Sequence, residues 1–235
     1  MKFGIRRLIL GNPRKDMKPA EGSLHKRIRN IRSIWFNEQD EDVGIEKLFR
    51  LFLGVSQFFF PGTYIKELFG RKGVAMRELS VDVFVLIKVL FPLWLAYSGW
   101  YRSHVLFLIM IWFLLETLLY VPTLIFASDY FNRPRSYRRS MLLLFFNYIE
   151  IAFSFGVIYS RGHFFNKAFT HWFDPVYFSF VTLSTVGYGE YYPVTPAGKA
   201  LICIESTIFV TFVVLFLNFF STKVEHKGYF DHTKQ

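Results

Sequence analysis

The sequence predicts an all-α membrane protein with four membrane-spanning helices and one shorter re-entrant segment. Hydrophobic residues make up 52% of the 235 residues and aromatic residues 20%, with 30 phenylalanines among them. A helix needs roughly 20 mostly apolar residues to cross a bilayer. Four segments approach or exceed that length and carry few charges; they are residues 83–101, 105–127, 141–159 and 197–220.

A fifth apolar segment, residues 173–184, is too short to cross a membrane. It is followed by Thr-Val-Gly-Tyr-Gly, residues 185–189, whose glycines suit neither a helix nor a strand. Irregular backbone at membrane depth is tolerated only where it is buried in protein or lines a cavity. We therefore expect residues 173–189 to enter the membrane and return on the same side.

The charge distribution predicts the topology and excludes one class of partner. The net charge is +10, and Lys and Arg cluster in residues 1–32 and 133–139, outside the apolar segments. Because positive connectors stay in the cytoplasm, both termini are expected inside and residues 160–196 outside. The protein would lie in the plasma membrane, or in the inner membrane of a bacterium. No basic stretch is interleaved with aromatic residues, so we expect no nucleic acid partner.

Residues 1–80 are predicted to be a basic cytoplasmic region that contains an amphipathic helix at about residues 45–60. Lys47, Arg50 and Gln57 recur at helical spacing, and phenylalanines and leucines fill the other face. We expect Pro61-Gly62 to end this helix. It could lie at the membrane surface beside the basic segment, which would bind anionic lipid. It could equally bury its apolar face within a small cytoplasmic domain.

Residues 81–130 are predicted to form two extra spans ahead of the third apolar segment. Each of these three predicted spans contains one charged residue. Lys88, Glu116 and Glu150 lie at similar depths when counted at about 1.5 Å per residue along each helix. Charges are costly in hydrocarbon, so we expect Lys88 to pair with Glu116 or Glu150 and to fix the register of the spans. A sensor role for these charges is the alternative.

Two dipeptides frame the re-entrant segment. Asp174-Pro175 and Thr195-Pro196 each combine a residue that can cap a helix with a proline suited to the first helical position. The first pair would start a short pore helix whose last residues include Val181, Thr182 and Ser184. Its carboxyl end, which carries partial negative charge, would point toward residues 185–189. Gly187 and Gly189 can adopt positive φ, which allows successive carbonyls to point to one side.

Residues 140–221, and the string YFSFVTLSTVGYG in particular, resemble the potassium channel pore-loop family. In that family rings of TVGYG carbonyls replace the hydration shell of K⁺, and this loop is the standard example of the principle. The resemblance implies a selectivity filter formed by Thr185, Val186, Gly187, Tyr188 and Gly189. K⁺ would bind the carbonyls of the first four and the Thr185 hydroxyl, with the Tyr188 ring holding the filter's diameter. One filter per chain implies a homotetramer.

The chain departs from this family at several positions. Glu190 follows the filter where Asp is commoner, and Val181 stands where some channels have Glu. Phe209 replaces a frequent hinge glycine, so bending of the last span at that point is not expected. We hypothesise that Val213, Leu217 and Ser221 line the conduction path, with Leu217 near its narrowest apolar level; packing of Leu217 on neighbouring spans is the alternative. Glu205 is expected to pack behind the filter.

The predicted function is passive, potassium-selective conduction. No span carries Lys or Arg at repeated three-residue spacing, so the usual voltage sensor is not expected. The six histidines have no metal-ligand spacing and no nucleophile motif is present, which argues against an enzyme or an organic cofactor; K⁺ is the transported ion. A non-conducting or modulatory membrane subunit with a channel-like pore fold is the alternative. Another is a membrane-surface binding protein acting through residues 1–62. The tail would be residues 222–235.

Overall fold

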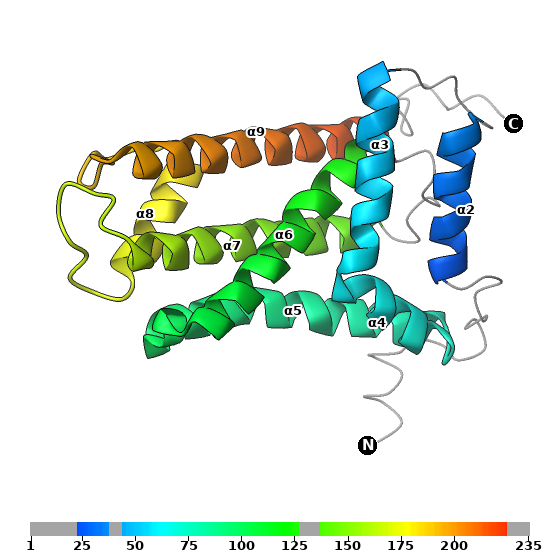
Figure 1. The fold of residues 1–235 in the computed structure, drawn as a ribbon, viewed down its shortest axis with the longest axis horizontal. Helices are drawn as coiled ribbons and strands as arrows, with labels where there is room; N and C mark the ends of the chain where they lie inside the picture. The colour runs from blue at the N-terminus through cyan, green and yellow to red at the C-terminus, as the bar shows by residue number, and fades with distance from the viewer. Residues whose placement is uncertain (1–22, 38–43, 127–136, 225–235) are drawn as a thin grey trace, which may run out of the picture. The chain divides into compact units, whose positions relative to one another are not determined.

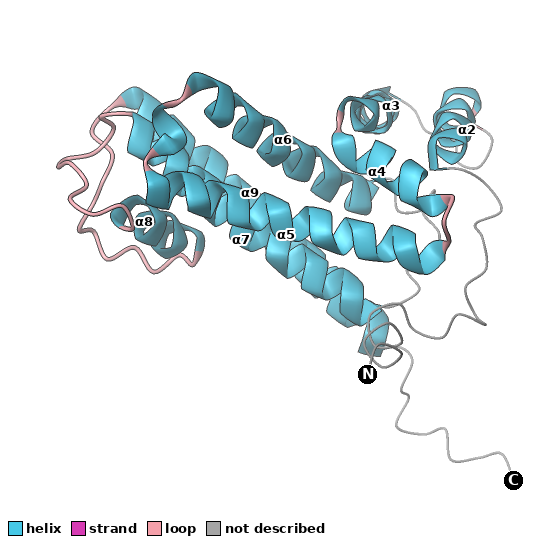
Figure 2. Cartoon of the chain, turned by 90° about the horizontal axis from the view of Figure 1, so that it is seen from below, coloured by secondary structure: helices cyan, strands magenta, loops and turns pink. Residues whose placement is uncertain are grey.

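The protein is helical throughout the part that the structure describes. The computed structural model describes residues 23–37, 44–126 and 137–224. These residues contain no β-strand, and their only sheet-like pairing is an isolated antiparallel bridge between Phe165 and Pro193 (Figure 2). The predicted all-α class is therefore confirmed. The basic segment of residues 1–22 and the last 11 residues lie outside the described range.

Eight α-helices and two short 3-10 helices follow one another along the described residues (Figure 1). They are α2 (Ser23–Phe36), α3 (Gly44–Ser56), η2 (Gln57–Phe59), α4 (Pro61–Gly70), α5 (Val74–Ser98), η3 (Trp100–Arg102), α6 (His104–Phe126), α7 (Tyr137–Arg161), α8 (Asp174–Leu183) and α9 (Pro196–Val224). Four of them, α5, α6, α7 and α9, are long and apolar enough to cross a membrane. This matches the four predicted spans, and the protein is a multi-pass membrane protein.

The largest difference in the spans is at the start of α5. This helix begins at Val74, nine residues before the predicted apolar segment at 83–101. Arg77, Glu78 and Asp82 occupy its first turns. Charged residues of this kind interrupt an apolar segment but form helices readily, so hydropathy alone places the helix start too late. At the other end α5 stops at Ser98, because Gly99 takes a left-handed φ of 72°.

The chain divides into two compact units, which are described separately below. The first contains residues 1–90 and 109–132, and the second contains residues 91–108 and 133–235. The predicted boundaries at residues 80, 130, 140 and 221 remain a prediction, since they rest on composition rather than on contacts.

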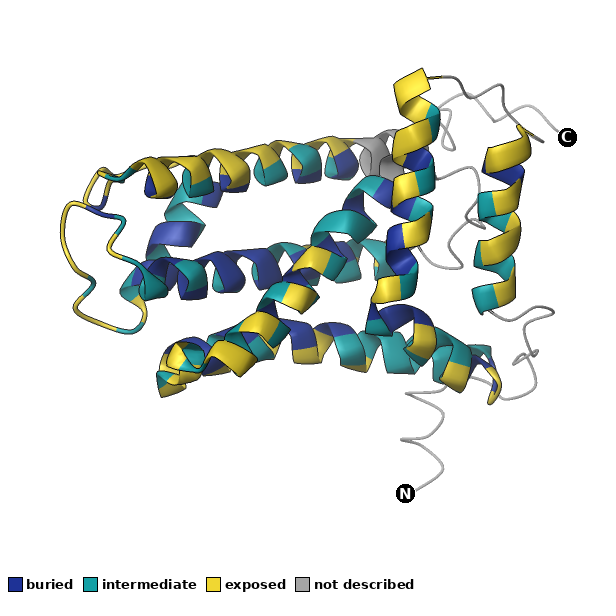
Figure 3. Cartoon of the chain, in the orientation of Figure 1, coloured by how far each residue is buried: buried dark blue, intermediate teal, exposed yellow. Residues whose placement is uncertain are grey.

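In the first unit α3 turns its polar side toward the protein. Arg50 is only 3% exposed and Leu53 is fully buried, whereas Leu48 and Phe52 are 69% and 55% exposed. Figure 3 shows the exposed face of α3 along its length. Among the described residues the apolar face of α3 is largely exposed, and both interpretations of this helix stay predictions.

The prediction that Pro61-Gly62 ends the amphipathic helix is wrong. Helix α3 ends earlier, at Ser56, and Pro61 instead begins α4. Pro lacks a backbone N–H and has a fixed φ, so it suits the first position of a helix as well as the position after one. Phe60, in an extended conformation with ψ of 143°, separates η2 from α4 and allows the change of direction.

Glu116, one of the predicted intramembrane charges, binds the start of α4. Its Oε1 accepts a hydrogen bond of 3.0 Å from the backbone N–H of Gly62, one of the unpaired donors of a helix N-terminus. A side chain at Gly62 would collide with this carboxylate. The Lys66 ammonium lies 5.2 Å from the centre of the Tyr120 ring, which adds a second link between α4 and α6.

Lys88 is buried and donates a hydrogen bond to the hydroxyl of Thr117, the residue after Glu116. This contact agrees with the expected link between the first two spans, and a direct ion pair between Lys88 and Glu116 remains a prediction. Glu150 is also buried, in α7 of the second unit, so its pairing with Lys88 remains a prediction too.

In the second unit α8 lies between α7 and α9 (Figure 1). The approach of α7 to α8 is close at Gly156, where an added Cβ would lie 2.9 Å from the Cα of Val176. Real Cβ atoms do not come that close to backbone, so glycine permits this packing. The result is a short helix held against two long ones, which positions the segment that follows it.

We predict that Glu116→Ala destabilises the protein by about 1–3 kcal/mol, since it leaves the Gly62 N–H of α4 without its acceptor. Glu116→Gln keeps an oxygen at the same place and should cost less. Chemical unfolding in detergent measures both, with Glu46→Ala, an exposed acid in α3, as the control. Equal effects of the Ala and Gln substitutions would contradict the proposed hydrogen-bond role.

Candidate functional site: the pore loop and its supports

The short helix α8 begins at the predicted dipeptide, but Asp174 does not cap it. The N-cap position is Phe173, and no side chain bonds to the helix start. Instead Asp174 Oδ2 accepts hydrogen bonds from the preceding backbone, from Thr170 N at 2.9 Å and His171 N at 2.8 Å. Asp174 therefore organises the loop before the helix. At α9 the expectation holds, since Thr195 Oγ1 accepts from Gly198 N at 3.1 Å.

The electrostatics of Asp174 follow from these bonds. Partial desolvation acts to raise the pKa of its carboxyl group, but the His171 and Thr170 N–H groups, the Thr170 hydroxyl and the Tyr191 hydroxyl all favour the charged form. The pKa therefore lies below the ordinary value, and Asp174 stays ionised under physiological conditions. An ionised Asp174 keeps this loop anchored at the start of α8.

The TVGYG segment has an alternating backbone. Thr185, Gly187 and Gly189 have positive φ angles of 58°, 58° and 76°, while Val186 and Tyr188 between them do not. Alternation between left-handed and right-handed residues turns successive peptide planes the same way, so carbonyls can gather on one side of the chain. Positive φ was expected at the two glycines; at Thr185 it is an addition that carries strain for a β-branched residue.

The last turn of α8 holds the start of this segment. The Val181 carbonyl accepts from Val186 N at 3.1 Å and from Gly187 N at 3.4 Å, and Thr182 O accepts from Thr185 N at 3.0 Å. Val181 and Thr182 lie in α8 as predicted, whereas Ser184 lies just beyond the end of the helix at Leu183. Three backbone N–H groups of the TVGYG segment are thus bonded to the carboxyl end of α8.

The outer surface of the TVGYG segment is open in a single chain. The Val186 side chain is 52% exposed and that of Tyr188 71%. Nothing lies within 4 Å of a Cβ built on Gly187 or Gly189. The Tyr188 ring therefore does not brace the filter within its own chain, and the role that the resemblance gives it needs a neighbouring subunit.

The side chain of Glu205 joins α7, α8 and α9. It is completely buried in α9. Its Oε1 accepts a 2.5 Å hydrogen bond from Ser179 Oγ of α8, and its Oε2 accepts a 2.5 Å hydrogen bond from Tyr159 OH of α7. Both donors are fully buried as well. Glu205 was expected behind the filter, but Ser179 and Tyr159 were not predicted to be its partners.

Aromatic side chains of α7, of α8 and of the loop between them also pack against one another. The rings of Tyr159, Phe165 and Phe178 meet edge to face with centroids 4.6–5.3 Å apart. Such contacts add about 0.5–1.5 kcal/mol each beyond burial. The Tyr191 ring, two residues after the filter, packs on Phe169 at 4.8 Å. The segment that follows residues 185–189 therefore packs against the segment that precedes α8.

Polar contacts fix the predicted outer-mouth acid. Glu190 Oε1 and Lys167 Nζ form a 3.0 Å ion pair in which both side chains are about half exposed. The hydrogen bond from Lys167 to Glu190 raises the pKa of the lysine, so its charge persists at alkaline pH. Asn166 adds reciprocal contacts, accepting from Tyr192 N and donating from its backbone to Tyr192 O, each at 3.0 Å. Neither Asn166 nor Lys167 was predicted.

The face of α9 proposed to line a conduction path is exposed in this chain. Val213 and Leu217, one helical turn apart, are 36% and 63% exposed, whereas Phe212 is buried against Tyr148 with ring centroids 5.7 Å apart. The side chain of Ser221 lies outside the described residues. This arrangement separates a packed face of α9 from an open one, and it suits either pore lining or contact with another subunit.

Comparison with known proteins agrees with this geometry. Residues 142–226 match the family model described as "Ion channel". The "Potassium channel K1" of Plasmodium berghei (strain Anka) is 60% identical over 38 residues, 16% of this chain and 2% of that protein. The chain therefore spans only a small part of that relative's length. No solved structure matches. Both matches support a potassium channel pore-loop family for this part of the chain, residues 142–226.

Proposed function

We propose that this chain is one subunit of a homotetrameric channel that conducts K⁺ passively and selectively across the plasma membrane, with both termini in the cytoplasm. The observation that carries the proposal is the alternating backbone of Thr185–Gly189, held by the Val181 carbonyl at the end of α8. A potassium channel match over part of the chain supports the choice of ion.

In the proposed mechanism, backbone oxygens replace the water around the ion. The carbonyls of Thr185, Val186, Gly187 and Tyr188, with the Thr185 hydroxyl, would form successive rings in the tetramer. The carboxyl end of α8 adds partial negative charge directed at the entering cation. At the outer mouth Lys167 offsets the charge of Glu190, so attraction of cations there depends less on this acid than in a channel with a free carboxylate.

Four chains are needed because one chain supplies one filter strand. Val186 and Tyr188 are open to the surroundings in a single chain, and their burial would come from neighbouring subunits. The open face of α9 would line the lower pathway or meet those neighbours. The protein part of the assembly in detergent should therefore have the mass of four 27.9 kDa chains.

The decisive experiment is K⁺ flux into liposomes that contain the purified protein, with Na⁺ as the comparison ion. Flux of K⁺ well above that of Na⁺ supports the proposal. A tetramer that carries neither ion would favour the alternative, a non-conducting or modulatory subunit that retains the pore fold.

Gly187→Ala should abolish K⁺ flux, because a side chain disfavours the φ of 58° that the filter requires there. Gly99→Ala is the matched control, since Gly99 also has positive φ and open space but lies outside the filter. The control should keep flux near the unmodified level at equal protein incorporation. Equal flux in the two variants would show that this backbone conformation is not needed for conduction.

Glu205→Ala should reduce K⁺/Na⁺ selectivity at least severalfold, since Ser179 and Tyr159 lose their shared acceptor and α8 loses its anchor. Glu205→Gln keeps an oxygen that can accept from Ser179 and should restore much of the selectivity. Reversal potentials in bilayers measure the ratio. An unchanged ratio in the alanine variant, with the tetramer intact, would argue that Glu205 acts only in folding.

Leu217→Ala tests the proposed apolar constriction formed by Val213, Leu217 and Ser221. A smaller side chain at the narrowest level should widen the path and increase open probability severalfold in single-channel recordings. Val214→Ala, another exposed branched residue on α9, is the control. If both variants open as often as the unmodified channel, Leu217 packs on neighbouring helices rather than gating.

A further inference from the structure

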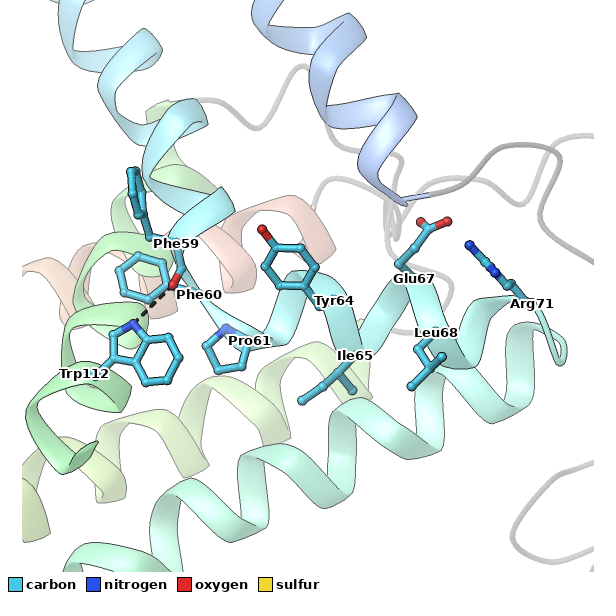
Figure 4. A pocket seen from close by; sticks show the side chains of 9 residues that line it. All are labelled: Phe59, Phe60, Pro61, Tyr64, Ile65, Glu67, Leu68, Arg71 and Trp112. Carbon is cyan, nitrogen blue, oxygen red and sulfur yellow. Dashed lines mark hydrogen bonds between the residues drawn. The ribbon is translucent and has the colours of Figure 1, made fainter. Parts of the chain in front are cut away.

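A groove runs along α4 in the first unit. Its volume is about 500 Å³, within the range of small-molecule sites. Most of its lining is apolar, with two charged residues, Glu67 and Arg71, at one end. The lining residues are Phe59, Phe60, Pro61, Tyr64, Ile65, Glu67, Leu68, Arg71 and Trp112. Figure 4 shows Trp112 at one end and Glu67 with Arg71 at the other.

The apolar end of the groove is built on a membrane-spanning helix. Trp112 lies within the span of α6, and its Nε1 donates a 3.2 Å hydrogen bond to the Phe59 carbonyl, which fixes the ring against the start of α4. A side chain at Gly62 would come within 3.3 Å of Phe84 in α5. This contact places the start of α4 level with the apolar segment of α5, which begins at Val83 directly after Asp82.

The other end of the groove lies at a polar level. Arg71 follows the last residue of α4 and is exposed, and Gly70 lies beside the side chain of Arg77, which precedes the apolar part of α5. The Glu67 carboxylate already has a partner in α2, since its Oε2 accepts a 3.2 Å hydrogen bond from the backbone N–H of Leu24. Arg71 thus offers a guanidinium at the polar end of an otherwise apolar groove.

We propose that this groove binds one membrane phospholipid, with an acyl chain along Pro61, Ile65, Leu68 and Trp112 and the phosphate at Arg71. The groove changes from apolar to cationic over the length of α4, as a phospholipid changes from chain to phosphate at the membrane surface. Arg suits phosphate because its planar guanidinium can donate two parallel hydrogen bonds. At the apolar end of the groove the Phe59 side chain is 71% exposed, and Leu48 and Phe52 on the outward face of α3 are exposed as well, so this end suits contact with acyl chains.

This site is independent of the proposed conduction, so its test needs no channel activity. The full-length protein is stripped of lipid in detergent, and palmitoyl-oleoyl phosphatidylglycerol is then added while native mass spectrometry counts bound molecules. Arg71→Gln should weaken the tightest binding event roughly tenfold, through loss of a charge-assisted contact. Lys72→Gln, which removes the neighbouring charge that stacks on Phe69 outside the groove, should change it less than about twofold.

A second pair of variants tests the apolar part. Leu68→Trp fills the groove and should remove the tightly bound lipid, whereas Leu115→Trp, at an exposed position of α6 outside the groove, should not. Equal lipid binding within both pairs overturns the proposal. K⁺ flux measured on the same preparations separates this outcome from failure of the channel proposal.

Discussion

The pore region depends on one buried carboxylate. Glu205 of α9 accepts hydrogen bonds from Ser179 of α8 and from Tyr159 of α7. Its two carboxylate oxygens therefore link three helices. The filter has no comparable anchor of its own, because its N–H groups at Val186 and Gly187 bond only to Val181 at the end of α8. The position of the filter therefore follows the position of α8. Since Glu205 is fully buried, losing either donor would leave a polar atom unsatisfied in an apolar surrounding.

The spans and the positive φ angles of Gly187 and Gly189 could be predicted from sequence, because each leaves a local pattern. A membrane span is a matter of length and apolar composition, and the alternating filter needs glycine at fixed positions. The partners of Glu205 leave no such pattern. An acid inside an apolar helix requires a donor. However, several Ser, Thr and Tyr residues lie in these segments, and only the three-dimensional approach of α7, α8 and α9 selects Tyr159 and Ser179. Lys167 and Asn166 at the outer mouth were missed for the same reason.

The boundary between α3 and α4 differs from the prediction because proline can follow the end of a helix or occupy the first position of the next one. Pro61 was interpreted as an end, yet it begins α4, and the tie that stabilises this start is 54 residues away at Glu116. The same acid was expected to pair with Lys88. Its Oε1 accepts from the Gly62 N–H and Lys88 donates to the neighbouring Thr117, while pairing of the two charges stays a prediction. The structural role of these charges stays a prediction, and the sequence pattern did not indicate a helix N-terminus as a source of partial positive charge for Glu116.

The strain in the filter also limits what a single chain can do. Thr185 holds a φ of 58°, which costs of order 1–3 kcal/mol for a residue with a branched side chain. Such a conformation persists only where surrounding contacts determine it. Within one chain these contacts lie on the α8 side alone, and the side of Val186 and Tyr188 is open. In the homotetramer that we propose, neighbouring filters would close the open side. The backbone geometry that selects the ion would then be stable only in the assembly that forms the pore, which couples selectivity to correct assembly.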